Sequence, residues 1–165
     1  MFILPMAALF ALAPHPADGG IVYIKGRQLL AEVARSAAER RRLLAFRNLF
    51  KAERCMFVVP PDAGLHPVQT AKFLLPFDVI WVDEMGTIVE AIASIPPCSA
   101  GKSCPSHGGT VVSRYHVFLH AGMIRRLGIR VGDHVGWAIH FQDGSCLKGN
   151  LSTSNGSGPH KDAIN

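Results

Sequence analysis

The sequence predicts a mainly β fold, a barrel or sandwich, with one or two short helices. Sixteen Gly and eleven Pro among 165 residues imply frequent turns, which favours strands over long helices. Hydrophobic residues make up 48% of the chain and charged residues 18%, a balance typical of a folded globular domain. Short apolar runs separated by turn residues complete the pattern of a β-rich domain.

One domain is expected between two flanking segments. Residues 1–20 are interpreted as a signal peptide and linker, residues 21–148 as a single β-rich domain, and residues 149–165 as a disordered polar tail. The first thirteen residues are almost wholly apolar and end in small residues, as the core and cleavage site of a secretory signal do. The absence of a preceding Lys or Arg and the following Pro14 count against cleavage. We favour a periplasmic or secreted location over the cytoplasmic alternative.

The apolar run at the start is too short to cross a bilayer, so no stable membrane span is expected. The formal net charge is +5, and the basic residues concentrate between Arg35 and Arg54. A basic helix is more often a solvated face than a phosphate-binding track, and no nucleic-acid signature accompanies it. No nucleic-acid partner is therefore expected.

The expected strands are short, and several form hairpins with their neighbours in sequence. They cover residues 21–24, 29–33, 56–59, 77–82, 87–95, 111–119 and 134–141. The turn Asp143-Gly144 predicts one further hairpin. Residues 60–76 are expected to form a long irregular connection, and such loops often carry sites.

Two helices are expected. Ser36 lies three residues before Glu39, the spacing of a capping box, so a helix should begin at Ala37 and end near residues 46–50. Residues 121–127 should form a second, short helix that stops at Gly128.

Several motifs then occur in a characteristic order. They are Val33-Ala34, Glu39-Arg40, residues 42–47, residues 55–58, residues 76–83, residues 86–89, Ala121-Gly122, residues 127–129 and residues 131–135. Over roughly residues 22–138 the chain resembles the uncharacterised bacterial and archaeal family called domain of unknown function 192. The resemblance implies a compact β-barrel or sandwich with one or two short helices, and no established activity. Some exported members of the family have a Pro-Cys…Cys loop where this chain has Cys98 and Cys104.

The chain departs from the family pattern just before Pro76. Members often have Trp-Met-Lys-Asn-Thr or a His-Thr variant there, and only Thr70 matches the second form. Two family glycines are replaced by Leu43 and Cys55. The chain therefore matches the family more closely in its structural motifs than in its polar residues.

Arg47, Thr70 and Asp78 are the candidates for a ligand-binding polar pocket. Arg and Asp side chains form bidentate pairs, which can orient a ligand's carboxylate or pin the long loop. Of these two roles, we favour the one in which the pair holds the long loop in place, with ligand binding as the alternative.

His116 and His120 are four residues apart, so both should lie on one face of a strand. Together with His107 and the nearby cysteines they suggest a metal site. The spacing matches no standard zinc pattern, and exposed strand histidines are the plainer interpretation.

The four cysteines differ in their surroundings. Cys98 and Cys104 bracket a short loop and are the expected disulfide pair, provided that the chain is exported. Cys55 lies in an apolar run and is expected to be a buried, inert thiol.

The sequence favours a non-catalytic domain that binds a small molecule or a protein partner. It has no Gly-x-Ser-x-Gly motif and no phosphate loop, and no cofactor is expected. Two alternatives remain: a metal-handling protein that uses His and Cys, or an enzyme with its site on residues 60–76 and the Asp78 strand.

Overall fold

The computed structural model describes residues 18–45, 53–71, 73–98 and 103–151. Within these ranges it contains ten strands and two short helices, which confirms the predicted fold class. The elements are β1 (Gly19–Ile24), β2 (Arg27–Ala34), α1 (Ala37–Ala45), β3 (Arg54–Val58), β4 (Val68–Gln69), β5 (Phe77–Val82), β6 (Ile88–Ile95), β7 (Ser106–His107), β8 (Tyr115–His120), α2 (Met123–Leu127), β9 (Val135–His140) and β10 (Cys146–Gly149).

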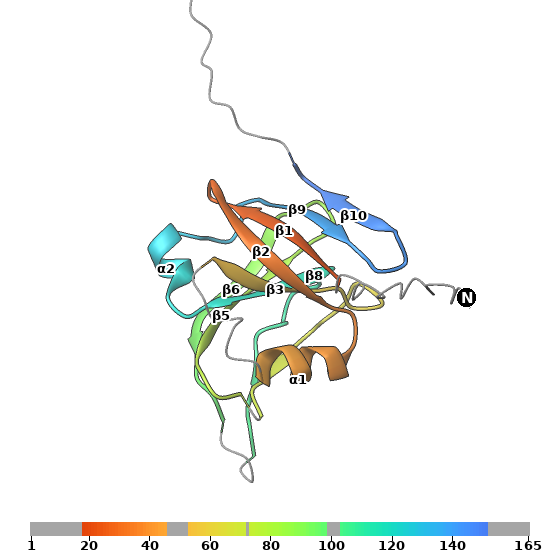
Figure 1. The fold of residues 1–165 in the computed structure, drawn as a ribbon. Helices are drawn as coiled ribbons and strands as arrows, with labels where there is room; N and C mark the ends of the chain where they lie inside the picture. Colours follow the sequence, from red (N-terminus) through yellow and green to blue (C-terminus); the bar gives the residue numbers. More distant parts are fainter. Residues whose placement is uncertain (1–17, 46–52, 72, 99–102, 152–165) are drawn as a thin grey trace, which may run out of the picture.

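Eight strands form one sheet in the order β10-β9-β1-β2-β3-β8-β5-β6, which curls into a half-barrel (Figure 1). Strands β4 and β7 form a separate two-stranded sheet. All pairs are antiparallel except β2 and β3, which run parallel with α1 in their connection. Among the described residues, no helix is long and apolar enough to cross a membrane.

The first hairpin is tighter than the sequence suggested. Ile24 pairs with Arg27, so only Lys25 and Gly26 form the turn. Both have positive φ, 48° and 72°, as in the type I′ turn that matches the twist of paired strands.

The start of α1 confirms the predicted capping box. The backbone N–H of Glu39 donates to the Ser36 hydroxyl at 3.1 Å, and the Glu39 carboxylate accepts from the Ser36 N–H at 3.0 Å. Two backbone donors that the helix leaves unpaired are satisfied in this way.

Both faces of the central strands are covered, so the domain has two cores. The inner core includes Val22, Ile24, Leu29, Phe57, Ile80, Val117, Met123, Val135 and Trp137. The outer core is Ala34, Met56, Val58, Val68, Phe77, Val79, Trp81, Ile95 and Phe118. Alternate residues of β5 contribute to the two cores, and all six residues of this strand are buried.

The connection of residues 60–76 is less irregular than expected. Val68 and Gln69 pair with β7, and isolated bridges join Gly64 to Ser113 and Ala71 to Cys98. The segment thus lies over the outer core, to which Val68 and Phe73 contribute.

Some strand boundaries differ from those expected. β3 begins earlier, at Arg54, and β8 begins later, at Tyr115. Val111 and Val112 lie outside the sheet, where they are 44% and 60% exposed. The hairpin at Asp143-Gly144 is confirmed, and its second strand β10 includes Gly149, which the sequence had assigned to the tail. Residues 152–165 lie outside the described part.

Candidate binding groove

A groove of about 490 Å³ lies between the β1–β2 hairpin and α2. Its walls come from the hairpin, from the residue before β3 and from one side of the helix. The lining residues are Ile21, Gly26, Arg27, Gln28, Leu29, Leu30, Glu53, Met123, Arg126 and Leu127. The groove borders the inner core, to which its residues Leu29 and Met123 also belong.

The groove combines an apolar floor with charged groups at its rim. Leu29 and Met123 are each 2% exposed, whereas the side chains of Arg27, Arg126 and Glu53 reach solvent. The Arg126 guanidinium donates to the Met123 thioether sulfur at 2.6 Å. The guanidinium of Arg126 therefore contacts the floor, although the residue is exposed.

The helix α2 forms one wall and is only five residues long. Gly122 before it and Gly128 after it have φ values of 87° and 63°. The N–H of Gly128 donates to the Arg125 carbonyl, and that of Ile129 donates to the Ile124 carbonyl. Gly128 thus ends the helix as predicted, in the left-handed conformation that glycine adopts most readily.

Asp78 fixes the other end of this helix. Its side chain is 0% exposed and accepts three backbone hydrogen bonds, from Ser94 at 2.8 Å, Gly122 at 3.1 Å and Ile124 at 2.8 Å. Gly122 has no side chain with which to cap α2, so the carboxylate of Asp78 satisfies the helix's free N–H groups instead. Asp78 acts through α2 on the groove, without lining it.

Thr70 lies apart from Asp78. It belongs to the segment over the outer core, whereas Asp78 is on the β5 face that points to the inner core. Thr70 is 0% exposed, and its hydroxyl has no partner among the described residues. Arg47 lies outside the described residues. The described structure therefore does not bring Thr70 and Asp78 into one pocket.

Two further carboxylates on or next to β5 and β6 also bind backbone groups. Asp83 accepts from the N–H groups of Met85 and Thr87 in the β5–β6 turn, at 2.9 Å and 2.8 Å. Glu90 accepts from the N–H of Thr110 at 2.9 Å. Each of these carboxylates satisfies a local turn or loop, as Asp78 satisfies a helix end.

Comparison with known proteins identifies the family. The model of the family DUF192, described as "Uncharacterized ACR", matches residues 20–137. The chain belongs to the DUF192 family. No curated protein matches this DUF192 domain.

Two solved structures share its fold. One is a protein of Sinorhizobium meliloti 1021 described as a "putative transcription regulator", with 21% identity and a TM-score of 0.58, covering 76% of this chain and 96% of the other. The second is a protein of unknown function from Novosphingobium aromaticivorans DSM 12444, with 22% identity and a TM-score of 0.56, covering 73% and 84%. At this identity the likeness supports the fold of the DUF192 domain alone.

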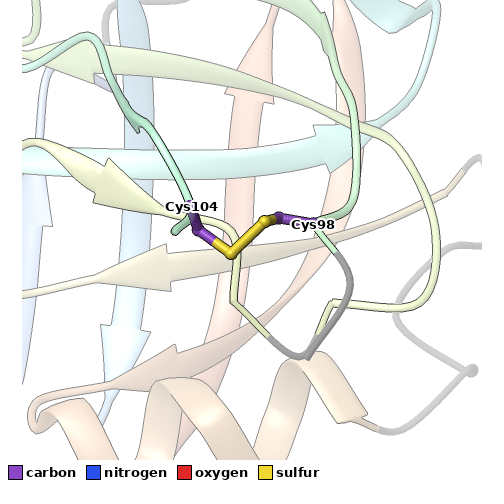
Figure 2. The surroundings of a disulfide bond; sticks show 2 residues. All are labelled: Cys98 and Cys104. Atoms are coloured by element: carbon purple, nitrogen blue, oxygen red, sulfur yellow. A yellow bond between two sulfur atoms is a disulfide. The ribbon is translucent and has the colours of Figure 1, made fainter. Parts of the chain in front are cut away.

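The predicted disulfide of the DUF192 domain is confirmed. Cys98 and Cys104 are joined with an S–S distance of 2.05 Å and Cα atoms 5.8 Å apart (Figure 2). The bridge links the segment after β6 to the segment that leads into β7. Cys55 is buried, also as predicted, and burial, with a smaller contribution from the charge of Glu32, raises the pKa of its thiol.

The three histidines considered for a metal site differ in their surroundings. His116 is 1% exposed, so its interpretation as an exposed strand residue is wrong. The ring of His120 contacts the Ala121 carbonyl at 2.8 Å, and His107 lies on β7. No group of three or more His, Cys, Asp or Glu residues placed to hold a metal ion is found in the described ranges.

Sequence reasoning missed the groove of the DUF192 domain and one histidine. Arg126 gave no signal beyond lying on a short helix, because its role depends on a hairpin about a hundred residues earlier in the chain. His66 lies in the expected long connection, and its ring centre is 5.9 Å from that of His116. Only the folded chain brings Arg126 next to the β1–β2 hairpin and His66 next to His116.

Proposed function

We propose that this DUF192 domain is an exported, non-catalytic binding module whose groove takes a small amphiphilic anion. One observation carries the proposal: the buried apolar floor of Leu29 and Met123 lies beside the exposed cations Arg27 and Arg126. An apolar body would cover the floor, and an anionic head group would face the rim.

The head group follows from the chemistry of arginine. A guanidinium offers planar, paired donors that match a carboxylate or phosphate group. The two groove arginines outnumber the single acidic residue there, Glu53, and the whole chain has a formal charge of +5. Anions are therefore attracted both locally and by the chain as a whole.

The floor suits a flexible apolar chain rather than one rigid shape. Met123 is unbranched and polarisable, so it adapts to different ligand shapes. Leu127 and Ile21 extend the apolar surface. The volume of the groove, a few hundred Å³, is typical of small-molecule sites.

Export is the part of the proposal that rests on the cysteines and the apolar start. Disulfides persist in oxidising compartments and are rare in the cytosol, and Cys98 and Cys104 are bonded. Mass spectrometry of the protein from its native host tests this part. We expect a mature chain without residues 1–13 and with the bridge intact; a full-length chain with free thiols would overturn it.

Binding is tested with decanoate as the probe, by ¹H–¹⁵N NMR titration of the purified protein. We expect shifts confined to the β1–β2 hairpin and α2. Arg126→Gln should weaken binding several-fold, since an exposed ion pair contributes up to about 1 kcal/mol. Decanol, which lacks the charge, should bind more weakly than decanoate.

The matched control is Arg125→Gln. Arg125 is exposed on the same helix and carries the same charge, but it does not line the groove. Equal weakening by both substitutions, or decanoate shifts spread over the whole sheet, would show that only general charge or nonspecific association is measured.

A further inference from the structure

A buried histidine without hydrogen-bond partners lies on the other side of the sheet from the groove. His116 on β8 shares its face with the outer-core residue Phe118, whose ring centre is 5.7 Å away. His116 is 1% exposed, and neither ring nitrogen has a partner among the described residues. Leaving a buried polar group unpaired is unfavourable, so such a group usually has an ion or water as partner.

A second imidazole lies next to it. The ring centres of His66 and His116 are 5.9 Å apart, with an angle of 42° between the ring planes. The Nε2 atom of His66 is 3.0 Å from the carbonyl oxygen of Asp62. A carbonyl oxygen only accepts, so Nε2 carries the proton and Nδ1 keeps a free lone pair. Such a hydrogen bond to a backbone carbonyl is how metal-binding histidines are commonly oriented.

Trp81 holds both histidines in place. On β5 it is the direct register partner of His116, and its indole N–H donates to the His66 carbonyl at 2.9 Å. On the other side, Gly109 packs so closely on the backbone of His66 and Pro67 that a Cβ would lie 2.2 Å from the His66 carbonyl carbon. The backbone position of His66 is therefore set from two directions.

We propose that His66 and His116 bind one soft monovalent ion, Cu(I), between their rings. Metal–imidazole bonds of about 2 Å on opposite sides of one ion place two ring centres about 6 Å apart, close to the observed separation. His66 is only half-buried, so the ion has a route from solvent.

The charges around the pair favour a monovalent ion over a dication. Arg40 of α1 lies near enough for its charge to act on His116, and no carboxylate in the described part of the chain acts on His116 in the same way. Zn²⁺ in structural sites requires four ligands, and no group of three potential ligands occurs in the described ranges. Cu(I), by contrast, is satisfied by two nitrogen donors in line and adds only one positive charge.

The test is an anaerobic Cu(I) titration of the folded chain against a chromophoric Cu(I) chelator. All samples carry Cys146→Ser, because Cys146 is an exposed thiol 3.1 Å from His140 and would compete for Cu(I). We expect one ion per chain, and at least tenfold weaker binding in His66→Gln. His120→Gln, a histidine on the same strand face, should bind as tightly as the parent.

Histidine ¹⁵N spectra with Ag(I), a redox-inert analogue, then locate the ion. The proposal expects the ring signals of His66 and His116 to shift together and the other histidines to remain unchanged. His66→Gln leaves His116 and its surroundings intact, so a loss of binding in that variant does not depend on misfolding. No uptake, uptake unaffected by His66→Gln, or tighter binding of Zn²⁺ than of Cu(I) would overturn the proposal.

Discussion

The carboxylate of Asp78 accepts the backbone N–H of Ile124 at 2.8 Å, across 46 residues of sequence. The same side chain binds the N–H groups of Gly122 and Ser94. The strand β5 therefore holds the start of α2 and the last part of β6 through one buried side chain. Because α2 forms one wall of the groove, this contact also positions the groove.

Replacing Asp78 should loosen α2. Asp78→Ala leaves three backbone donors without their acceptor, and we expect a loss on the order of 3 kcal/mol in the free energy of unfolding. Urea denaturation measures it, and amide exchange should accelerate first at Gly122 and Ile124. Asp62→Ala, an exposed control, should change stability by less than about 0.5 kcal/mol. A stable Asp78→Ala with unchanged exchange in α2 would contradict this role.

His116 should make the metal-free protein less stable in mild acid. Its pKa is about 3 in the folded state and near 6.5 when unfolded, so the unfolded chain binds the proton more tightly. Stability is then full above pH 6.5 and falls as the pH drops toward 3. Between pH 7.5 and 5 we expect a loss of about 2 kcal/mol in the free energy of unfolding, measured with a chelator present.

The acid effect should disappear when the imidazole is removed. His116→Phe keeps an aromatic ring in the outer core and cannot take up a proton, so its stability should be nearly flat over the same range. His134→Gln provides the control. An equal slope in wild type and His116→Phe would assign the effect to other groups.

The two free thiols should differ in reactivity: Cys146 should react with a thiol reagent in the native protein, and Cys55 should not. Cys146 is exposed on β10, whereas Cys55 is 1% exposed in the inner core, and the other two cysteines form the disulfide. A thiol-specific chromogenic reagent should therefore detect one thiol per native chain and two after unfolding without a reductant. Cys146→Ser should give none in the native state; a residual native signal would show that Cys55 is accessible.

Removing the disulfide should loosen the small β4–β7 sheet in particular. The Cys98 N–H donates to the Thr70 carbonyl, so the bridge ties this carbonyl to the start of β7. For a closed loop this short we expect the Cys98→Ser/Cys104→Ser variant to lose about 2 kcal/mol. Hydrogen exchange should increase at Gln69 and Ser106 and stay unchanged in β1 and β9. Uniform acceleration throughout the large sheet would instead indicate global destabilisation.

Elements with local signals were predictable from the sequence. The capping box of Ser36 and Glu39, the stop at Gly128 and the turn between β5 and β6 each depend on residues close together in the sequence. Side-chain spacing and turn chemistry are sufficient at that range. The burial of β5 also followed from its apolar residues, although Asp78 interrupts them.

The candidate site was far less predictable, because its contacts are long-range. Asp78 was recognised as a polar residue of interest, but its partners in α2 could not be read from local pattern. The burial of His116 depends on a segment fifty residues away, which carries His66. The same holds for the pairing of β2 with β3 and for the contact between the β1–β2 hairpin and α2, which carries Arg126. Neither can be predicted without the order of the strands in the whole sheet.

The position of β1 in the sheet limits how early the domain can finish folding. This first strand lies between β2 and β9, and its register with β9 joins Gly19 to His140. During synthesis, one edge of β1 stays without a partner until nearly the whole domain has been made. Because such distant contacts form slowly, we expect β1 to gain its second partner strand only after synthesis of β9 is complete.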